Sequence, residues 1–318
     1  MALMFGHNSN VDIEFESTYG TTPSGNWKRV PVVSFDPGVS QPWDRLDVIG
    51  LAGGRDEPAP LRGLLTVEPT VEVPMDLVNV GYWLRALLGS PTTTGTTNRT
   101  HVFKSGGASL PSLSIQHANS ALSANPFMLV SGARANTFEA SFRFGEALQT
   151  ATVGLVGLNA ARAAATASGT PTSATFAPFT GAIGTVTRAG VALGRITGAT
   201  MRFSNGLEVL REANRASGAI TEAAPGVSEV TGSVDVRMDT DTLLADSEGS
   251  AAVKLAFGYS VNANQALTFT VEAAYLDRTM PAVRGRAGIQ ATFSFRGAFD
   301  ATATCALTAT LLNQQSAY

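Results

Sequence analysis

The stretch Val71-Glu72-Val73-Pro74-Met75-Asp76 returns later in the chain as Val234-Asp235-Val236-Arg237-Met238-Asp239. Three further segment pairs follow in the same order in both halves. They are Leu113-Ser114-Ile115-Gln116 with Leu267-Thr268-Phe269-Thr270, Ala140-Ser141-Phe142-Arg143-Phe144 with Ala291-Thr292-Phe293-Ser294-Phe295, and Thr150-Ala151-Thr152 with Thr302-Ala303-Thr304. Ordered matches of this kind indicate two copies of one β-rich domain related by internal duplication. Two like domains in one chain can occupy equivalent positions in a ring, which favours assembly over chemistry.

Each copy is predicted to be mainly β, a sandwich or partly closed barrel with one packed α-helix. β-branched and alternating runs predict strands at 30–35, 64–73, 100–104, 111–117, 126–131, 137–144 and 148–157 in the first copy. In the second copy they predict strands at 200–203, 229–237, 267–275, 287–297 and 301–311, with a partly helical segment at 239–257.

A helix is expected after Asp76, which we interpret as its N-cap. Leu77, Val80, Trp83, Leu84, Leu87 and Leu88 recur at spacings of three and four. This spacing forms one apolar stripe, which is typical of a helix packed on a sheet. Gly89 and Pro91 stop the helix.

The predicted boundaries are a first domain at 1–158, an Ala/Gly/Thr-rich linker or arm at 159–182, and a second domain at 183–318. Arg162, Arg188 and Arg195 are the only charged residues between Ala147 and Thr200. Two long loops, 36–62 and 204–225, fall at matching places in the two copies. The first is rich in proline and contains Leu46, Val48, Ile49 and Leu51, so we expect both loops to be docking arms.

Charged residues make up 15% of the chain, below the roughly 25% of typical domains. We therefore expect part of the uncharged surface to be buried against partners. The net charge of −3 argues against binding nucleic acid through a basic face. The N-terminus lacks the pattern of a signal peptide, and no apolar run approaches the roughly 20 residues of a membrane helix. The chain is expected to fold in the cytoplasm without a membrane partner.

No residue pattern in the chain predicts catalysis. Cys305 is the only cysteine and is interpreted as a buried strand residue. His7, His101 and His117 lack metal-ligand spacing. Asp235, Asp239, Asp241, Asp246 and Glu248 form the densest acidic cluster, in which Asp239 is interpreted as a helix cap. The sequence predicts no catalytic, cofactor-binding or metal-ligating residue and no cofactor.

A resemblance to a known family rests on three stretches. They are Phe15-Glu16-Ser17-Thr18-Tyr19-Gly20-Thr21-Thr22-Pro23, Met201-Arg202-Phe203-Ser204-Asn205-Gly206-Leu207-Glu208, and Val227-Ser228-Glu229-Val230-Thr231-Gly232-Ser233-Val234-Asp235-Val236. In this order they resemble tail tube proteins of long-tailed, non-contractile phages over most of residues 11–312. The resemblance implies stacked rings that form a hollow virion tube, with a tape-measure protein inside and double-stranded DNA passing later. It also implies tail terminator and distal tail proteins as partners at the ends, and long loops that reach the neighbouring ring.

The duplication adds two expectations. Three chains would supply six domains to each ring, instead of the six single-domain chains common in that family. The lumen would be acidic or neutral, with carboxylates facing inward, because a basic wall would retain DNA. The candidates are Glu68, Glu72, Asp235 and Glu272.

Two other function classes stay open. One is a two-domain β-sandwich binding module of a phage tail, for a receptor or a carbohydrate, although Trp27, Trp43 and Trp83 do not cluster in sequence. The other is a metal-assisted hydrolase, which has only the acidic cluster in its favour.

Overall fold

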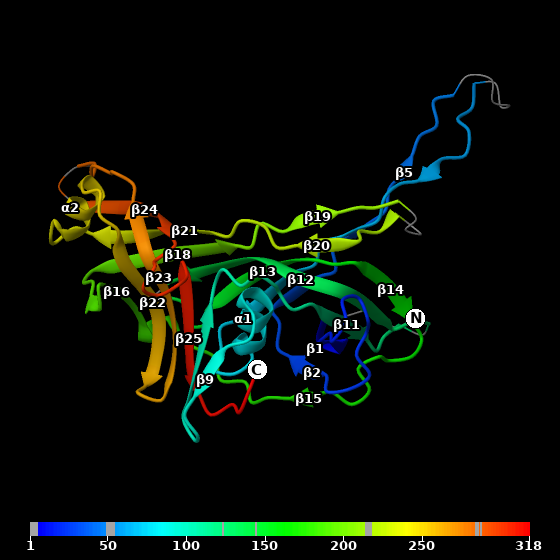
Figure 1. The fold of residues 1–318 in the computed structure, drawn as a ribbon, viewed down its shortest axis with the longest axis horizontal. Helices are drawn as coiled ribbons and strands as arrows, with labels where there is room; N and C mark the ends of the chain where they lie inside the picture. Colours follow the sequence, from blue (N-terminus) through cyan, green and yellow to red (C-terminus); the bar gives the residue numbers. More distant parts are fainter. Residues whose placement is uncertain are drawn as a thin grey trace.

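The computed structural model describes residues 6–48, 55–122, 124–143, 145–213, 218–283, 286 and 288–318. Among the residues singled out from the sequence, Ile49, Leu51 and Phe144 lie outside these ranges. The described chain is mainly β with two α-helices, and its strands do not close into a barrel. Pairing joins 19 of the strands into one connected network (Figure 1).

The first half contains the elements β1 (Ser9–Phe15), β2 (Lys28–Val30), β3 (Ser34–Asp36), β4 (Val39–Ser40), β5 (Trp43–Asp44), β6 (Leu61–Arg62), β7 (Thr66–Val67), β8 (Thr70–Pro74), α1 (Val80–Leu88), β9 (Thr92–Thr94), β10 (Arg99–Lys104), β11 (Leu113–Asn119), β12 (Phe127–Phe142), β13 (Thr150–Val156) and β14 (Asn159–Ala163). The short β15 (Thr172–Ser173) follows and pairs with β2. Single 3-10 turns lie at Gly6–Asn8 and Gly181–Ile183.

The second half contains the elements β16 (Gly184–Arg188), β17 (Val191–Ala192), β18 (Ile196–Ser204), β19 (Glu208–Leu210), β20 (Glu222–Ala224), β21 (Glu229–Arg237), α2 (Thr242–Glu248), β22 (Val253–Asn262), β23 (Gln265–Leu276), β24 (Gln290–Ala298) and β25 (Leu307–Asn313). The sequence predicted β18, β21, β23, β24 and β25 but missed β16, β17, β19, β20 and β22. It split β12 in two at Gly132, where the strand in fact continues with the glycine at a φ of 64°.

The two halves have the same order of antiparallel strand pairings. In the first half, β1 pairs with β2 and β11, β3 with β8, β8 with β13, and β12 with β11, β13 and β14. In the second half, β16 pairs with β17 and β22, β18 with β21, β21 with β24, and β23 with β22, β24 and β25. Each strand of the first set therefore has a counterpart in the second.

The correspondence extends to irregularities in the strands. The β11–β12 register shifts between the pairs Leu113–Ala133 and Ile115–Val130, and the β22–β23 register shifts in the same way between Val253–Ala274 and Leu255–Val271. Two glycines also correspond. A Cβ on Gly157 would lie 2.8 Å from Val67 Cγ1, and one on Gly297 would lie 2.9 Å from Val230 Cβ. Side chains larger than hydrogen do not fit at either place.

These pairings correct most of the segment matches made from the sequence. The first match joins β8 to β21, which are counterparts. The second joins β11 to β23, and the third joins β12 to β24, although β11 corresponds to β22 and β12 to β23. The fourth sets β13 against the turn at 302–304. Strands rich in Ala, Thr and Val alternate with a period of two, so a shift to a neighbouring strand still matches apolar with apolar.

The helices begin later than the sequence suggested. The Asp76 carboxylate accepts hydrogen bonds from the backbone N–H of Asn79 (3.1 Å) and Val80 (2.8 Å), so it caps α1 from four residues before its start. Burial raises the pKa of this carboxyl group, while these hydrogen bonds act in the opposite direction. Asp239 is not a cap, because Asp241 occupies the N-cap position of α2 and Asp239 forms an ion pair with Arg195.

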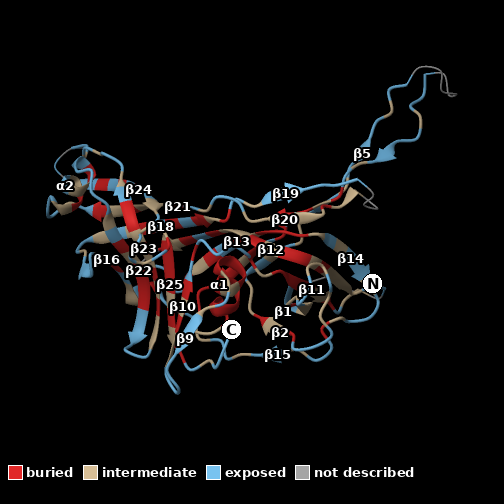
Figure 2. Cartoon of the chain, in the orientation of Figure 1, coloured by how far each residue is buried: buried red, intermediate tan, exposed pale blue. Residues whose placement is uncertain are grey.

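One hydrophobic core spans both halves (Figure 2). β12 pairs with β18 from Thr137–Ser204 to Phe142–Ala199, and β10 pairs with β25 along six residue pairs. Buried aromatic side chains of β12 then contact those of β22 and β23; they are Phe138, Phe142, Phe257, Tyr259 and Phe269. Both sheet pairing and packing therefore hold the halves together.

Candidate functional site: a polar sheet face and two arms

A polar face extends over β3, β8, β13, β12, β18, β21 and β24, which are neighbours in this order. Side chains alternate along each strand, and the apolar set of these strands is buried. The opposite set is rich in hydroxyl groups. It includes Ser34, Thr70, Thr137, Ser141, Thr150, Thr152, Thr200, Ser204, Thr231, Ser233, Thr292 and Ser294.

Short side chains on this face hydrogen-bond across the strands. Thr200 Oγ1 lies 2.9 Å from Ser233 Oγ, and the Thr292 hydroxyl donates to Asp235 Oδ1 at 2.6 Å. These short side chains already use hydrogen-bonding groups on one another, so they have little reach to hold a ligand. The face is thus a sheet surface of short polar side chains, which offers little shape for specific binding.

Carboxylates outnumber guanidinium groups on the polar face. The acidic residues are Asp36, Glu72, Glu139, Glu229 and Asp235, and the basic residues are Arg202, Arg237 and Arg296. Glu139 stands directly opposite Arg202 in the β12–β18 pair. Glu229 forms a 2.8 Å ion pair with Arg296.

The four acidic residues expected at a lumen do not lie together. Glu72 and Asp235 share the polar face. Glu68 lies between β7 and β8 at the base of an arm. Glu272 is almost buried, where it pairs with Lys254 at 2.6 Å and accepts the Thr308 hydroxyl. Residues Glu139 and Glu229 were missed, although the strict alternation around them could have identified them.

Each half sends out one long arm, which we define as residues 37–69 (first arm) and 205–228 (second arm). The second arm contains the hairpin β19–β20 and lies along the first half (Figure 1). Asn205 donates its side-chain amide to Leu87 O and Ala135 O, both at 2.9 Å. Arg134 donates to Glu222 Oε1 at 2.8 Å and to Ala223 O at 2.7 Å.

Apolar contacts complete this intrachain docking. Ile220 and Ala223 of the second arm form a small buried cluster with Val156 at the end of β13. Leu158 of the first half and Leu207 of the arm pack against the same cluster. The second arm is therefore a strap across the middle of β12 and the end of β13.

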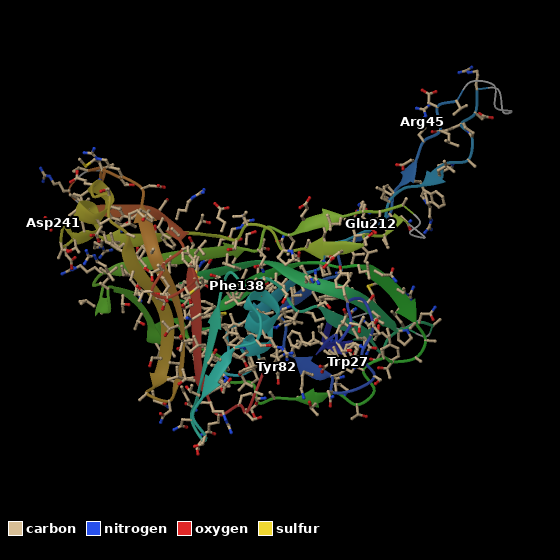
Figure 3. All side chains as sticks on the ribbon, viewed as in Figure 1. Trp27, Arg45, Tyr82, Phe138, Glu212 and Asp241 are labelled. Atoms are coloured by element: carbon tan, nitrogen blue, oxygen red, sulfur yellow. The ribbon has the colours of Figure 1, made fainter. Side chains whose placement is uncertain are left out.

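The first arm projects away from the body (Figure 1). Its outer part carries Arg45, while Glu212 near the tip of the second arm lies beside its base (Figure 3). Large apolar side chains on the first arm are exposed, and Trp43 and Leu61 each keep 60% of their surface accessible. A projecting segment of this kind is typical of contacts with another molecule.

The phage tail tube protein family matches residues 6–297. The chain belongs to this family. No curated protein matches it. Family membership gives the chain a structural role in a phage tail tube and makes it a component of the virion tail, where tail tube subunits assemble with one another.

The histidines, the cysteine and the tryptophans singled out from the sequence of this tail tube protein do not gather at one site. His101 is fully buried between β9 and the C-terminal residues, whereas His117 lies against Phe35. Cys305 is buried as expected but forms an isolated β-bridge with Asp300 before β25 and does not lie within a strand. Trp27 and Trp83 are buried in the core, while Trp43 is on the first arm beneath the Arg62 guanidinium.

Asp235, Asp239, Asp246 and Glu248 have separate partners. Arg195 pairs with Asp239, Arg188 with Asp246, and Arg278 with Glu248. Asp235 instead accepts the Thr292 hydroxyl. Within the described ranges, His, Cys, Asp and Glu side chains form no group of three or more suited to a metal ion. Neither described helix has the length and apolar character needed to span a bilayer.

Proposed function

We propose that this tail tube protein forms rings of three chains, in which six similar domains give pseudo-sixfold symmetry. The observation that supports the proposal is the repeated pairing order, including the shared register shift in β11–β12 and β22–β23. We infer from it an internal duplication. Because β14 (Asn159–Ala163) is the counterpart of β25, the first domain extends past the expected boundary at 158 to residue 163, and residues 164–182 join it to the second domain at 183–318. A ring closes when each domain meets its neighbours through the same pair of surfaces.

The rings stack into the conduit for genome delivery, with the polar face lining the lumen. Its hydroxyl groups keep a hydrated surface, and its excess of carboxylates repels phosphate groups. Duplex DNA then moves through without specific binding, since tight binding needs basic side chains that neutralise phosphates. The face has no feature that would read a sequence.

The same face contacts the tape-measure protein before DNA passage, and tail terminator and distal tail proteins contact the two ends of the tube. We propose that the chain folds and assembles in the host cytoplasm. The subunit has no enzymatic role in this scheme.

Native mass spectrometry of isolated rings, together with a symmetry-resolved reconstruction of tubes, tests the proposal. We expect three chains per ring and a channel lined by Glu72, Glu139 and Asp235. Six chains per ring would contradict the trimer. A channel lined by rings of unpaired Arg and Lys would contradict the lumen assignment.

A further inference from the structure

The hairpins of the two arms stand at matching register positions. Phe35 pairs with Val71 in the first half, and Ala199 pairs with Val234 in the second. Asp44 lies nine residues after Phe35, and its partner Leu61 lies ten residues before Val71. In the same way, Glu208 lies nine residues after Ala199, and its partner Ala224 lies ten residues before Val234. The hairpin β5–β6 is therefore the counterpart of β19–β20.

The bases of the arms follow the same register. The pair Val39–Val67 is reached by moving four residues from the pair Phe35–Val71 towards the arm. The pair Phe203–Val230 is reached by the same step from Ala199–Val234. In the first arm the ladder is interrupted between β3 and β4, where Gly38 adopts a φ of 57° and approaches Glu68. At this break the first arm leaves the sheet, whereas β18 continues to Ser204 and the second arm has its positive-φ glycine further out, at Gly206 with a φ of 55°.

The surface under the second arm also has a counterpart. In the first half it includes Arg134 and Val156, which face each other across β12 and β13, followed by Leu158. The matching positions in the second half are Tyr275 and Arg296, which face each other across β23 and β24, followed by Ala298.

No described segment of the chain covers this second surface. Tyr275 is 48% exposed, and the neighbouring Phe299 is 67% exposed. The first arm presents Trp43 where the second arm has Leu207, and Leu61 where it has Ala224, so larger apolar groups face outward from it. Within the chain, the second arm covers the surface around Arg134 and Val156. The first arm and the surface around Tyr275 are the counterparts of that pair, and both are exposed.

We propose that the first arm of one copy docks at the β24 edge of the polar face, on Tyr275, Arg296 and Phe299 of the next copy in the same ring, as the second arm docks within the chain. The occupant is a second copy because the contact repeats an interface that this chain already makes with itself. This inference rests on the self-assembly in the proposed function. It assigns the inner part of the first arm to contacts within a ring, whereas the sequence suggested contacts between rings.

The edge of the sheet is consistent with this arrangement. β18, from which the second arm leaves, pairs with β12. Its counterpart β3 pairs only with β8 among the described strands, so its other edge is open. β23, the counterpart of β12, ends at Leu276, and the exposed segment that follows can meet the open edge of β3.

Chemical cross-linking tests the docking. Pro60 and Arg296 are the counterparts of Ala223 and Val156, which belong to one buried cluster within the chain. The double variant Pro60→Cys/Arg296→Cys is assembled into tubes and treated with a short bismaleimide. We expect a denaturing gel to show linked chains whose number stops at the copy number of one ring, because contacts within a ring close on themselves.

Contacts between rings would give a ladder that runs past this number and would overturn the proposal. Absence of linked chains in well-formed tubes would also overturn it. The control pair Pro60→Cys/Asn264→Cys moves the second cysteine to the exposed β22–β23 turn and should not link. Failure to form any rings would count against the proposed function instead, and a ladder that stops at six would contradict the trimer but support the arm contact.

A second test replaces Trp43, the largest exposed apolar side chain of the first arm. Trp43→Ala should raise the protein concentration needed for ring formation by about tenfold or more, because a buried tryptophan commonly dominates an interface. The control Val261→Ala shortens a similarly exposed apolar side chain on β22 and should leave assembly unchanged. Thermal melting of the unassembled chain should be the same for both. Unchanged assembly of Trp43→Ala would overturn the docking.

Discussion

Phe138 of β12 packs against Phe269 of β23, with ring centroids 5.5 Å apart and both side chains fully buried. The contact crosses from the first half of the tail tube protein to the second. Phe138→Ala should lower the free energy of unfolding by about 3–5 kcal/mol, because it leaves a cavity in the shared core. Chemical denaturation of the unassembled chain would measure this change.

The same experiment tests whether the halves are one folding unit. A shared core predicts a single cooperative transition for both the wild type and the Phe138 variant. Phe176→Ala provides a control, since Phe176 is about half exposed. Two separate transitions in the wild type, or a change below about 1 kcal/mol in Phe138→Ala, would contradict a common core.

The second arm depends on Asn205, which is buried and donates to Leu87 O and Ala135 O. Asn205→Ala should destabilise the chain by about 2 kcal/mol, because two buried carbonyl groups lose a donor. Limited proteolysis should also cut the arm near its tip more rapidly. Asn264→Ala, in an exposed turn, should change neither property. Equal proteolysis of the wild type and Asn205→Ala would argue that other contacts hold the strap.

His101 should make stability depend on pH. Its Nε2 donates to Gln315 O at 3.1 Å, and its Nδ1 accepts from the Thr93 hydroxyl at 2.8 Å. Burial lowers the pKa of His101 below its ordinary 6.5. The unfolded chain therefore binds a proton at a pH where the folded chain does not. Stability is complete above about pH 6.5 and falls as the pH drops towards the lowered pKa.

Denaturation midpoints measured from about pH 7.5 to about pH 5 would follow this effect. In His101→Gln the decline should be smaller than in the wild type, even if the variant is less stable overall. Burial also lowers the pKa of His117, so His117→Gln should reduce the remaining decline. An unchanged decline in both variants would exclude these histidines as its source.

Local patterns predicted the parts of the fold that local contacts determine. The apolar stripe from Val80 to Leu88 gave α1, and the alternation of Val71 and Val73 gave β8. The pairing of β10 with β25 joins residues that lie far apart in the sequence, and no local pattern carries that information. The bend at Gly38 and the docking of the second arm likewise depend on tertiary contacts.

The functional surface was only partly predictable for the same reason. Glu72 and Asp235 stand on alternating strands, and the structure places them on one face. Glu272 alternates equally well, but its carboxylate is held by Lys254 and Thr308 from neighbouring segments. Strand order across the sheet, from β3 to β24, decides which alternating residues share a face.

The last prediction concerns the charge of the polar face. Glu139 is exposed there, opposite Arg202. Glu139→Lys would replace an acidic group with a basic one and place it beside an arginine in every chain. Repetition in each ring would then create a continuous basic track along the tube. Each lysine that neutralises a phosphate releases a counterion, so many weak contacts along one duplex add up to retention.

Tubes assembled with short duplex DNA and then treated with nuclease measure that retention. Wild-type tubes should protect little DNA, whereas Glu139→Lys tubes should protect much more at low salt and progressively less as salt rises. Glu248→Lys makes the same change in charge on α2, away from the polar face, and should protect no more than the wild type. If Glu139→Lys and Glu248→Lys protect equal amounts, the polar face is not the lumen. If Glu139→Lys alone protects DNA, the side chains facing the channel are those that alternate with the buried core of β12.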